Sequence, residues 1–300
     1  MDKIQLTEHL WLSPIIHGHM RINDWNLSPQ GLLSLTNQLV EKGISSFDHA
    51  NIYDNYTCEK HFGDALRMQP GLRSQIEIIT KCGIELVSEK YPDRKLKIYD
   101  YRYENIMTSV EQSLKNLNTD SIDLLLLHRP APFWNPAEIS KAFDHLFRDG
   151  KVTHFGVSNF TKDQFETLQQ FCNHSLVTNQ LEISPYCLEH FDNGNLDFCL
   201  KHKIKPMAWS PLSGSEIFHP RTAKGIRLVP VLEKIKDEIS AKGIDGVIYA
   251  WLLKHPTQIL PIVGSGNLDR IQVAIDAFTL DMNLEQWYEI YNASKGAELP

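Results

Sequence analysis

The sequence predicts an α/β protein that folds as a (β/α)8 TIM barrel. Eight short apolar segments alternate with segments of helical periodicity along the 300 residues. The apolar segments are continuously hydrophobic, which is typical of parallel strands covered on both faces. Regular alternation of strands and helices over this length favours a barrel. Because no linker rich in Pro, Gly or Ser interrupts the pattern, we predict a single domain over residues 1–300.

The predicted strands are rich in aliphatic residues and occupy 12–18, 45–50, 76–82, 122–130, 152–160, 177–184, 205–212 and 259–266. The first helix has clear limits, because Ser28 suits an N-cap, Pro29 suits the first turn and Gly43 suits the end. The further predicted helices lie at 103–117, 136–148, 161–171, 195–202 and 229–254, the last with a break near Gly243. Additional C-terminal helices are predicted from about Leu268 and over 285–294. Long loops are expected at 83–102 and 213–228, after strands, where a barrel carries its working surface.

The composition argues against several functional classes. A net charge of −7 is unlike that of a dedicated nucleic-acid-binding protein. The longest apolar runs are too short to span a bilayer, and the N-terminus lacks the layout of a signal peptide. The five cysteines are scattered and include no C-x-x-C pair, which indicates reduced thiols. We therefore expect a cytoplasmic protein that acts without nucleic acid or membrane.

Four titratable residues fall at the carboxyl ends of predicted strands. Asp48 and Tyr53 follow the second strand, Lys81 ends the third and His128 follows the fourth. In a barrel these ends meet at one mouth. A free tyrosine has a pKa of about 10, and an adjacent ammonium lowers it. We predict that Asp48 holds Lys81, that Lys81 lowers the pKa of Tyr53, and that His128 hydrogen-bonds a substrate oxygen.

These segments resemble the aldo-keto reductase family over nearly the whole chain. The stretch FDHANIYDNYTCEKHFGDAL is similar to the one that carries the Asp and Tyr of the family's catalytic tetrad. IITKCG and IDLLLLHRP resemble the segments with its Lys and His. HFGVSNF, TNQLEIS, WSPL and VGSGNLDRI resemble the cofactor-binding segments, in the same order. The resemblance is greatest to bacterial single-chain, monomeric-type oxidoreductases of the family.

The resemblance implies an NADP-dependent enzyme that reduces aldehyde or ketone carbonyls, with Tyr53 as the general acid. The small-molecule carbonyl substrate would be oriented by His128. The implied cofactor-binding residues are Asp48, Ser158, Asn159, Gln180, Trp209, Ser210, Leu212, Ser265, Gly266, Asn267 and Arg270. Among them, Arg270 would form charge-assisted bonds to the 2′-phosphate, which favours NADP over NAD. The implied substrate-binding residues are Met20, Arg21, Trp25, His128 and Trp134, and we expect a monomer.

Several positions depart from the family pattern. Gly264 stands where the family usually has a Lys, and this difference weakens the expected phosphate site. His49 replaces a Thr, and Asp54 replaces the Gly that follows the catalytic Tyr. A carboxylate at Asp54 would raise the pKa of Tyr53 if it pointed inward, and we expect it to face solvent. All four tetrad positions are nevertheless filled.

Three other functions are compatible with parts of the sequence. His17 and His19 form the HGH pattern of barrel hydrolases that bind zinc, although the later strands lack the further ligands that such a site requires. Lys81 could form a Schiff base, as in barrel aldolases. A non-catalytic, NADP-binding redox regulator could use the same fold. A Rossmann domain is disfavoured, because no G-x-G-x-x-G follows the first strand.

Overall fold

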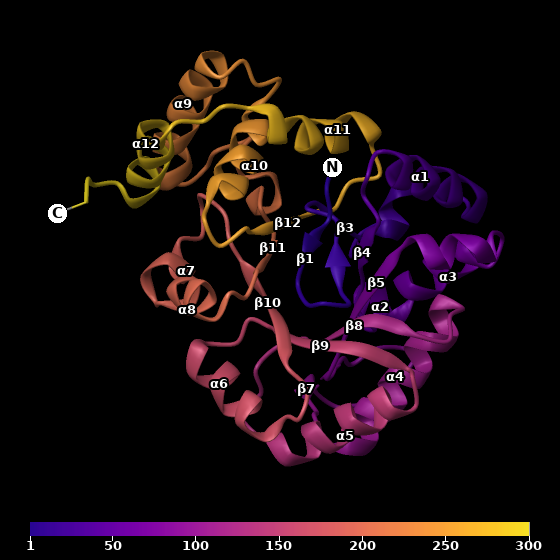
Figure 1. The fold of residues 1–300 in the computed structure, drawn as a ribbon. Coiled ribbons are helices and arrows are strands. Elements are labelled where there is room, and N and C mark those ends of the chain that lie inside the picture. Colours follow the sequence, from indigo (N-terminus) through magenta and orange to yellow (C-terminus); the bar gives the residue numbers. More distant parts are fainter. Residues whose placement is uncertain (300) are drawn as a thin grey trace. The chain divides into compact units, whose positions relative to one another are not determined.

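The computed structural model describes residues 1–299 and has a closed barrel of eight strands (Figure 1). The hydrogen-bonded order is β10-β11-β12-β3-β4-β5-β8-β9, so the barrel strands follow one another in chain order and the last of them, β12, lies next to the first, β3. Their bounds are β3 Ile16–Gly18, β4 Ser46–Asp48, β5 Glu77–Cys82, β8 Ile122–Leu127, β9 Val152–Ser158, β10 Leu176–Glu182, β11 Met207–Trp209 and β12 Leu260–Val263. The recorded pairs run parallel. The predicted (β/α)8 fold is confirmed.

Helices connect the barrel strands. They are α1 Pro29–Glu41, α2 Tyr53–Tyr56, α3 Cys58–Leu66, α4 Tyr103–Leu117, α5 Pro136–Arg148, α6 Lys162–Phe171, α7 Glu189–Asp192, α8 Asn195–His202, α9 Ala223–Glu238, α10 Ile244–Lys254, α11 Leu268–Asp276 and α12 Leu284–Lys295. Short 3-10 helices lie at Ile22–Trp25, Pro70–Gln75, Ser213–Ser215 and Ala277–Thr279. None of the helices within residues 1–299 is both long and hydrophobic enough to cross a bilayer.

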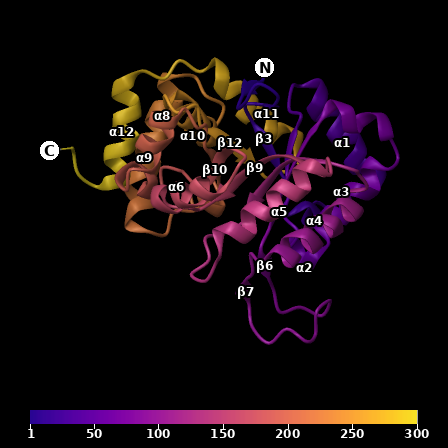
Figure 2. The same cartoon turned by 60° about the horizontal axis from the view of Figure 1, so that its bottom comes forward.

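Two features differ from the sequence prediction. Helix α9 begins at Ala223, so the predicted loop at 213–228 is wrong over its last residues. Its N-cap is Thr222, whose hydroxyl accepts a hydrogen bond from the Gly225 amide, and Pro230 lies inside the helix rather than in its first turn. The predicted loop at 83–102 contains a small antiparallel ribbon, β6 (Ile84–Glu85) with β7 (Ile98–Tyr99). Figure 2 shows this ribbon and the extended loop that joins its strands.

The contacts of the chain define two compact units, and the single-domain prediction stays a prediction. The first unit comprises Met1–Asn179 with Gly264–Gly266, and the second comprises Gln180–Val263 with the chain from Asn267 onward. The first has an additional N-terminal hairpin, β1 (Ile4–Gln5) with β2 (Trp11–Leu12).

The second unit has an aromatic core between α10 and α12. The rings of Trp251 and Trp287 stack with centroids 4.9 Å apart. Each indole N–H donates to the other residue's carbonyl oxygen, at 3.1 Å in both directions. The two helices are therefore held together by ring packing and by satisfied polar atoms at once.

Candidate active site

The four predicted catalytic residues come together in the first unit, at the carboxyl ends of adjacent strands. Asp48 is the last residue of β4, and Lys81 lies one residue before the end of β5. His128 directly follows β8, and Tyr53 is the first residue of α2. The strand register explains the meeting, because β5 pairs with β4 on one side and with β8 on the other.

Lys81 is the centre of this cluster and is completely buried. Its Nζ donates to Oδ1 and Oδ2 of Asp48, each at 2.7 Å, and to the His49 carbonyl oxygen at 2.7 Å. It also lies 2.9 Å from the Tyr53 hydroxyl. Burial by itself would lower the pKa of Lys81, but Asp48 and Tyr53 outweigh burial and raise it. Lys81 is therefore an ammonium paired with a buried carboxylate.

The pKa of Tyr53 differs from the sequence-based expectation. Burial of the phenol raises its pKa above the usual value, and the nearby Lys81 ammonium lowers the pKa by less than burial raises it. The prediction of a net lowering is therefore wrong, since desolvation disfavours the phenolate more strongly than one paired ammonium favours it. In this structure Tyr53 carries its proton at neutral pH.

His128 lies beside Tyr53 and is a neutral imidazole. The two rings meet edge to face, with centroids 5.8 Å apart. Burial, followed by the charge of Lys81, lowers the pKa of His128 well below its ordinary value. Its Nδ1 atom is buried and has no hydrogen-bond partner among the described residues. A neutral ring can donate one hydrogen bond to a carbonyl oxygen without bringing a full charge into the site.

The backbone directly after Tyr53 is strained. Asp54, Asn55 and Tyr56 have φ angles of 43°, 52° and 70°, so three successive residues other than glycine are left-handed. Each such residue costs on the order of 1–3 kcal/mol and persists only where its surroundings hold it. The Asp54 side chain is exposed, as expected, and accepts a hydrogen bond from Asn23 Nδ2 at 2.5 Å.

The HGH motif forms part of a buried histidine cluster with His49. His17 Nε2 lies 2.8 Å from the Ser265 carbonyl oxygen, and His17 Nδ1 lies 3.0 Å from His19 Nε2. Since a carbonyl only accepts, His17 carries its proton on Nε2 and His19 donates to His17 Nδ1. The His19 and His49 rings meet at 4.5 Å, and both nitrogens of His49 are buried without a partner in the described part of the chain.

Burial keeps this histidine cluster neutral. It lowers the pKa of His17 to about 4, and burial together with the charge of Lys81 lowers the pKa of His49 to about 3. Within residues 1–299, no group of three or more His, Cys, Asp or Glu side chains is arranged to hold a metal ion. The two imidazoles of the HGH motif instead contact each other and a backbone carbonyl.

The predicted cofactor residues of the first unit lie at the ends of barrel strands. Ser158 is the buried last residue of β9, and Asn159, which is left-handed at φ 62°, donates to its hydroxyl at 2.8 Å. The Ser265 carbonyl accepts from His17, as described above. Gly266 packs on Trp25, where an added Cβ would come within 2.6 Å of the indole. The 264–266 turn is therefore backed by the histidine cluster and by Trp25.

The other predicted cofactor residues belong to the second unit. Gln180 is buried in β10, Trp209 is the half-buried last residue of β11, and Ser210 is left-handed at φ 53°. Leu212 is half-buried just before a 3-10 helix.

Helix α11 begins with a side-chain cap at Asn267. The Asn267 side chain accepts hydrogen bonds from the amides of Asp269 and Arg270, at 2.8 and 3.2 Å. The first amides of a helix can bind an anion, and here the cap already engages two of them. The Arg270 side chain is exposed.

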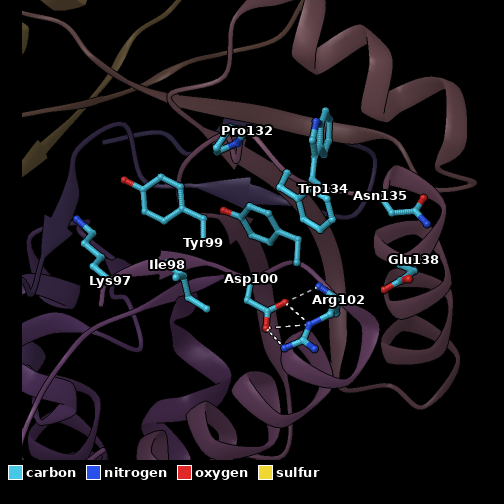
Figure 3. A pocket seen from close by; sticks show the side chains of 11 residues that line it. Lys97, Ile98, Tyr99, Asp100, Arg102, Pro132, Trp134, Asn135 and Glu138 are labelled. Atoms are coloured by element: carbon cyan, nitrogen blue, oxygen red, sulfur yellow. Dashed lines mark hydrogen bonds and ion pairs between the residues drawn. The ribbon is translucent and has the colours of Figure 1, made fainter. Parts of the chain in front are cut away.

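The predicted substrate residues differ in their surroundings. Met20 and Arg21 are exposed, and the Trp25 ring lies 5.2 Å from that of His17. Trp134 lines a cavity of about 850 Å³, next to the exposed Phe133 (Figure 3). The other lining residues are Lys97, Ile98, Tyr99, Asp100, Tyr101, Arg102, Pro132, Asn135 and Glu138. This cavity was not predicted, although the aromatic residues of 99–103 and 133–134 were a visible signal in the sequence.

Comparison with known proteins decides the family. The sequence profile of the aldo/keto reductase family matches residues 14–295. The chain belongs to the aldo/keto reductase family. It is 47% identical over 300 residues to the uncharacterized oxidoreductase YcsN of Bacillus subtilis, with all of both chains covered. It is 40% identical to a 6-dehydroglucose reductase of Agrobacterium fabrum, again with full coverage of both.

A solved aldo-keto reductase has the same fold. The thermostable aldo-keto reductase Tm1743, crystallised with the inhibitor epalrestat, superimposes with a TM-score of 0.80 over 98% of this chain and 100% of that one, at 21% identity. The family membership makes this aldo/keto reductase an oxidoreductase, and members of the family typically bind a nicotinamide cofactor.

Proposed function

We propose that this aldo/keto reductase reduces aldehyde and ketone carbonyls with NADPH, and that Tyr53 is the general acid. The observation that carries the proposal is the contact of 2.9 Å between the Tyr53 hydroxyl and the Lys81 ammonium, which is itself paired with Asp48. A protonated phenol beside a fixed cation can release its proton to a carbonyl oxygen as negative charge develops there.

Each residue of the cluster has a distinct part in this chemistry. Bound NADPH would supply the hydride to the carbonyl carbon. The Tyr53 O–H bond breaks and its proton goes to the carbonyl oxygen, leaving a phenolate next to the Lys81 ammonium. Asp48 fixes that ammonium, and the neutral His128 donates a hydrogen bond that orients the carbonyl. The raised pKa of Tyr53 means that the proton is present at neutral pH.

Replacement of Tyr53 by phenylalanine tests this assignment. Tyr53→Phe removes one oxygen, so we expect the rate of NADPH consumption with a panel of aldehydes to fall by about 10²–10⁴-fold. Tyr288→Phe, the same change at an exposed position of α12, should leave the rate unchanged. Cofactor binding should survive in both variants. Full activity of Tyr53→Phe would contradict the general acid, and cofactor binding without any turnover in the wild type would favour a non-catalytic regulator.

The residues also fit a phosphorylated dinucleotide. Ser158, Asn159 and Gln180 would hold the carboxamide, and Trp209 would lie against the nicotinamide ring. Ser210 and Leu212 would approach the pyrophosphate. Ser265, Gly266 and Asn267 would meet the adenosine end beside Arg270, whose exposed guanidinium suits the 2′-phosphate.

Cofactor preference can be measured by two binding titrations. We expect NADPH to bind more tightly than NADH, and Arg270→Ala to weaken NADPH binding by about 10-fold or more while changing NADH binding little, because a charge-assisted bond contributes about 1.5–3 kcal/mol. Lys254→Ala, which removes another exposed cation, is the control. Equal losses for the two cofactors would contradict the role of Arg270.

The substrate screen can be ordered by the relatives. Two of them are named 6-dehydroglucose reductase, so sugar carbonyls should be tested first, together with apolar aldehydes. We propose Met20, Arg21, Trp25, His128 and Trp134 as residues that contact the substrate.

A further inference from the structure

The segment 83–102 contacts the chain next to both Tyr53 and His128. It follows β5, which carries Lys81, and it contains the β6–β7 ribbon. The first part of the segment contacts Tyr56, which follows Tyr53, and Tyr101 near the end of the segment contacts Arg129, which follows His128. Both phenols are buried. Neither phenol belongs to the catalytic tetrad.

The first contact is a clamp around Tyr56, three residues after Tyr53. The Tyr56 hydroxyl accepts hydrogen bonds from the Leu86 amide at 2.8 Å and from Arg94 Nη1 at 2.7 Å. Arg94 also pairs with Glu85 at 3.1 Å and lies over the Tyr91 ring at 3.9 Å. The Tyr91 ring meets that of Tyr56 edge to face at 4.9 Å. The 85–94 stretch is therefore fastened to this single phenol.

The backbone at Tyr56 shows why such a fastening matters. Tyr56 ends the run of three left-handed residues that begins directly after Tyr53. Conformations of this kind persist only where surrounding contacts determine them. Asn23 holds the exposed Asp54 carboxylate, whereas Tyr56 is held by its buried ring and its doubly bonded hydroxyl. The contacts of Tyr56 therefore hold the backbone that follows Tyr53 from the interior of the protein.

The second contact is a clamp around Tyr101, and it reaches the residue after His128. The Tyr101 hydroxyl donates to the Arg129 carbonyl oxygen at 2.5 Å and accepts from the Arg129 amide at 3.0 Å. Gly83 makes room for the ring, because its φ is +100° and an added Cβ would come within 1.8 Å of the ring. The His128 amide donates to the Cys82 carbonyl, directly before this segment, whereas Arg129 is bonded to Tyr101 near the end of the segment. Tyr101 also lines the cavity of Figure 3.

We propose that Tyr56 and Tyr101 are positioning residues for the reaction: through segment 83–102, Tyr56 holds the backbone of Tyr53, and Tyr101 holds that of His128. The inference rests on the proposed roles of Tyr53 and His128. Displacing a catalytic group by about 1 Å can lower a rate by about 100-fold. Loss of one clamp should therefore lower turnover in a protein that remains folded.

Two single-atom changes test the proposal by kinetics. Tyr56→Phe and Tyr101→Phe each remove one hydroxyl, and we expect kcat to fall about 10-fold or more. The Kd of NADPH should stay within twofold of the wild type, and Tyr288→Phe should change neither quantity. A merely structural role would lower the thermal unfolding midpoint but leave kcat unchanged at 25 °C. If kcat stays within about twofold of the wild type in both variants, the proposal is overturned.

A double-mutant cycle separates the clamp from general destabilisation. Arg94→Gln removes the charged donor to the Tyr56 hydroxyl, and it should lower kcat in the same direction as Tyr56→Phe. Because both changes break the same hydrogen bond between Arg94 and Tyr56, the double variant should have a kcat little lower than that of Tyr56→Phe alone. Additive losses would contradict the clamp. Arg94 is partly exposed, so its variant tests the idea even where a buried change prevents folding.

Amide hydrogen exchange tests the same contacts without turnover. Tyr56→Phe should speed exchange at the amides of Leu86, Tyr53 and Thr57, and Tyr101→Phe should speed it at Arg129 and His128, by about fivefold or more in each case. Exchange in α12 should not change. Wild-type protein that lacks carbonyl reduction, with these exchange changes present, would overturn the proposed function but keep the clamps. Carbonyl reduction by the wild type, with unchanged amide exchange in Tyr56→Phe and Tyr101→Phe, would overturn the clamps and leave the proposed function standing.

Discussion

At the scale of single residues, Lys81 supplies the buried positive charge at the centre of the site. Its ammonium is completely buried and meets oxygens of Asp48, His49 and Tyr53 within 2.9 Å. A buried ion pair contributes little net stability, but removal of one partner leaves an uncompensated charge, which is strongly destabilising. Lys81 therefore supports both the folded state and the proposed proton transfer.

The variant Lys81→Met should lose activity and stability together. Methionine has a volume similar to that of lysine, but the change leaves the Asp48 carboxylate buried without its cation. We therefore expect the free energy of unfolding to fall by about 3–5 kcal/mol. We expect kcat to fall by about 100-fold or more, since the phenolate of Tyr53 loses its stabilising charge. Urea unfolding and steady-state kinetics measure the two effects.

Lys60→Met is the matched control for this change. Lys60 pairs with Asp64 on the surface of α3 at 2.6 Å, and its side chain is 64% exposed. An exposed pair of this kind contributes about 0.5 kcal/mol or less. Equal stability losses in Lys60→Met and Lys81→Met would show that the buried pair has no special role.

The meeting of the four proposed catalytic residues could be predicted from the sequence, whereas the electrostatics of the cluster could not. Asp48, Lys81 and His128 each follow an apolar run, and parallel strands bring such positions to one edge. The direction of the Tyr53 pKa depends on how completely distant segments exclude water from the phenol. The left-handed run after Tyr53 was also not predicted, because single Asp and Asn residues visit positive φ but three successive residues other than glycine rarely do, and Tyr56 is a bulky one.

At the scale of elements, close backbone contact between helices can be read from one glycine. Gly63 lies on α3, and a Cβ added there would come within 2.0 Å of the Asn116 carbonyl oxygen on α4. Both helices lie in the first unit (Figure 1). The two helix backbones therefore touch at this point without an intervening side chain.

Gly63→Ala should destabilise the protein in spite of the higher helix propensity of alanine. The added methyl group collides with backbone atoms, which cannot rotate away, so we expect the free energy of unfolding to fall by about 1–3 kcal/mol. Gly71→Ala, where a Cβ meets nothing within 4 Å, should be neutral or slightly stabilising. Urea unfolding of the pair gives the comparison, and equal values would refute the close contact.

The elements themselves were largely predictable, and the misses have local causes. Helices α5 and α8 begin and end at the predicted residues, because apolar periodicity and end signals agree there. Helix α9 begins at Ala223, earlier than the predicted 229, and Pro230 lies in its interior. The β6–β7 ribbon was missed because each strand is only two residues long and lacks a period.

At the scale of the whole molecule, the proposed cofactor residues are distributed over both compact units. Ser158, Asn159 and Ser265 belong to the first unit, whereas Gln180, Trp209 and Arg270 belong to the second. The sequence could assign these residues only by resemblance, since they lie far apart along the chain and share no local pattern. The four proposed catalytic residues all lie within the first unit.

The buried histidines of the first unit should limit the stability of the molecule in acid. His17 and His49 have pKa values of about 4 and about 3 in the folded chain, compared with 6.5 for a free histidine. Between pH 6.5 and pH 4 the unfolded chain therefore binds protons that the folded chain does not. The free energy of unfolding is therefore at its full value above about pH 6.5, and it should fall by about 3 kcal/mol for each of the two histidines by pH 4.

Urea unfolding at a series of pH values from 7.5 to 4.5 measures this loss. The free energy of unfolding should fall less steeply with decreasing pH in His49→Thr, because threonine does not titrate. The variant is compared by this slope and not by its stability at neutral pH. His9→Thr, which removes an exposed imidazole, should keep the wild-type slope. The protein would then unfold in mild acid by protonation of buried imidazoles, and not only by neutralisation of its surface carboxylates. A wild-type slope in His49→Thr would show that the acid response arises elsewhere in the molecule.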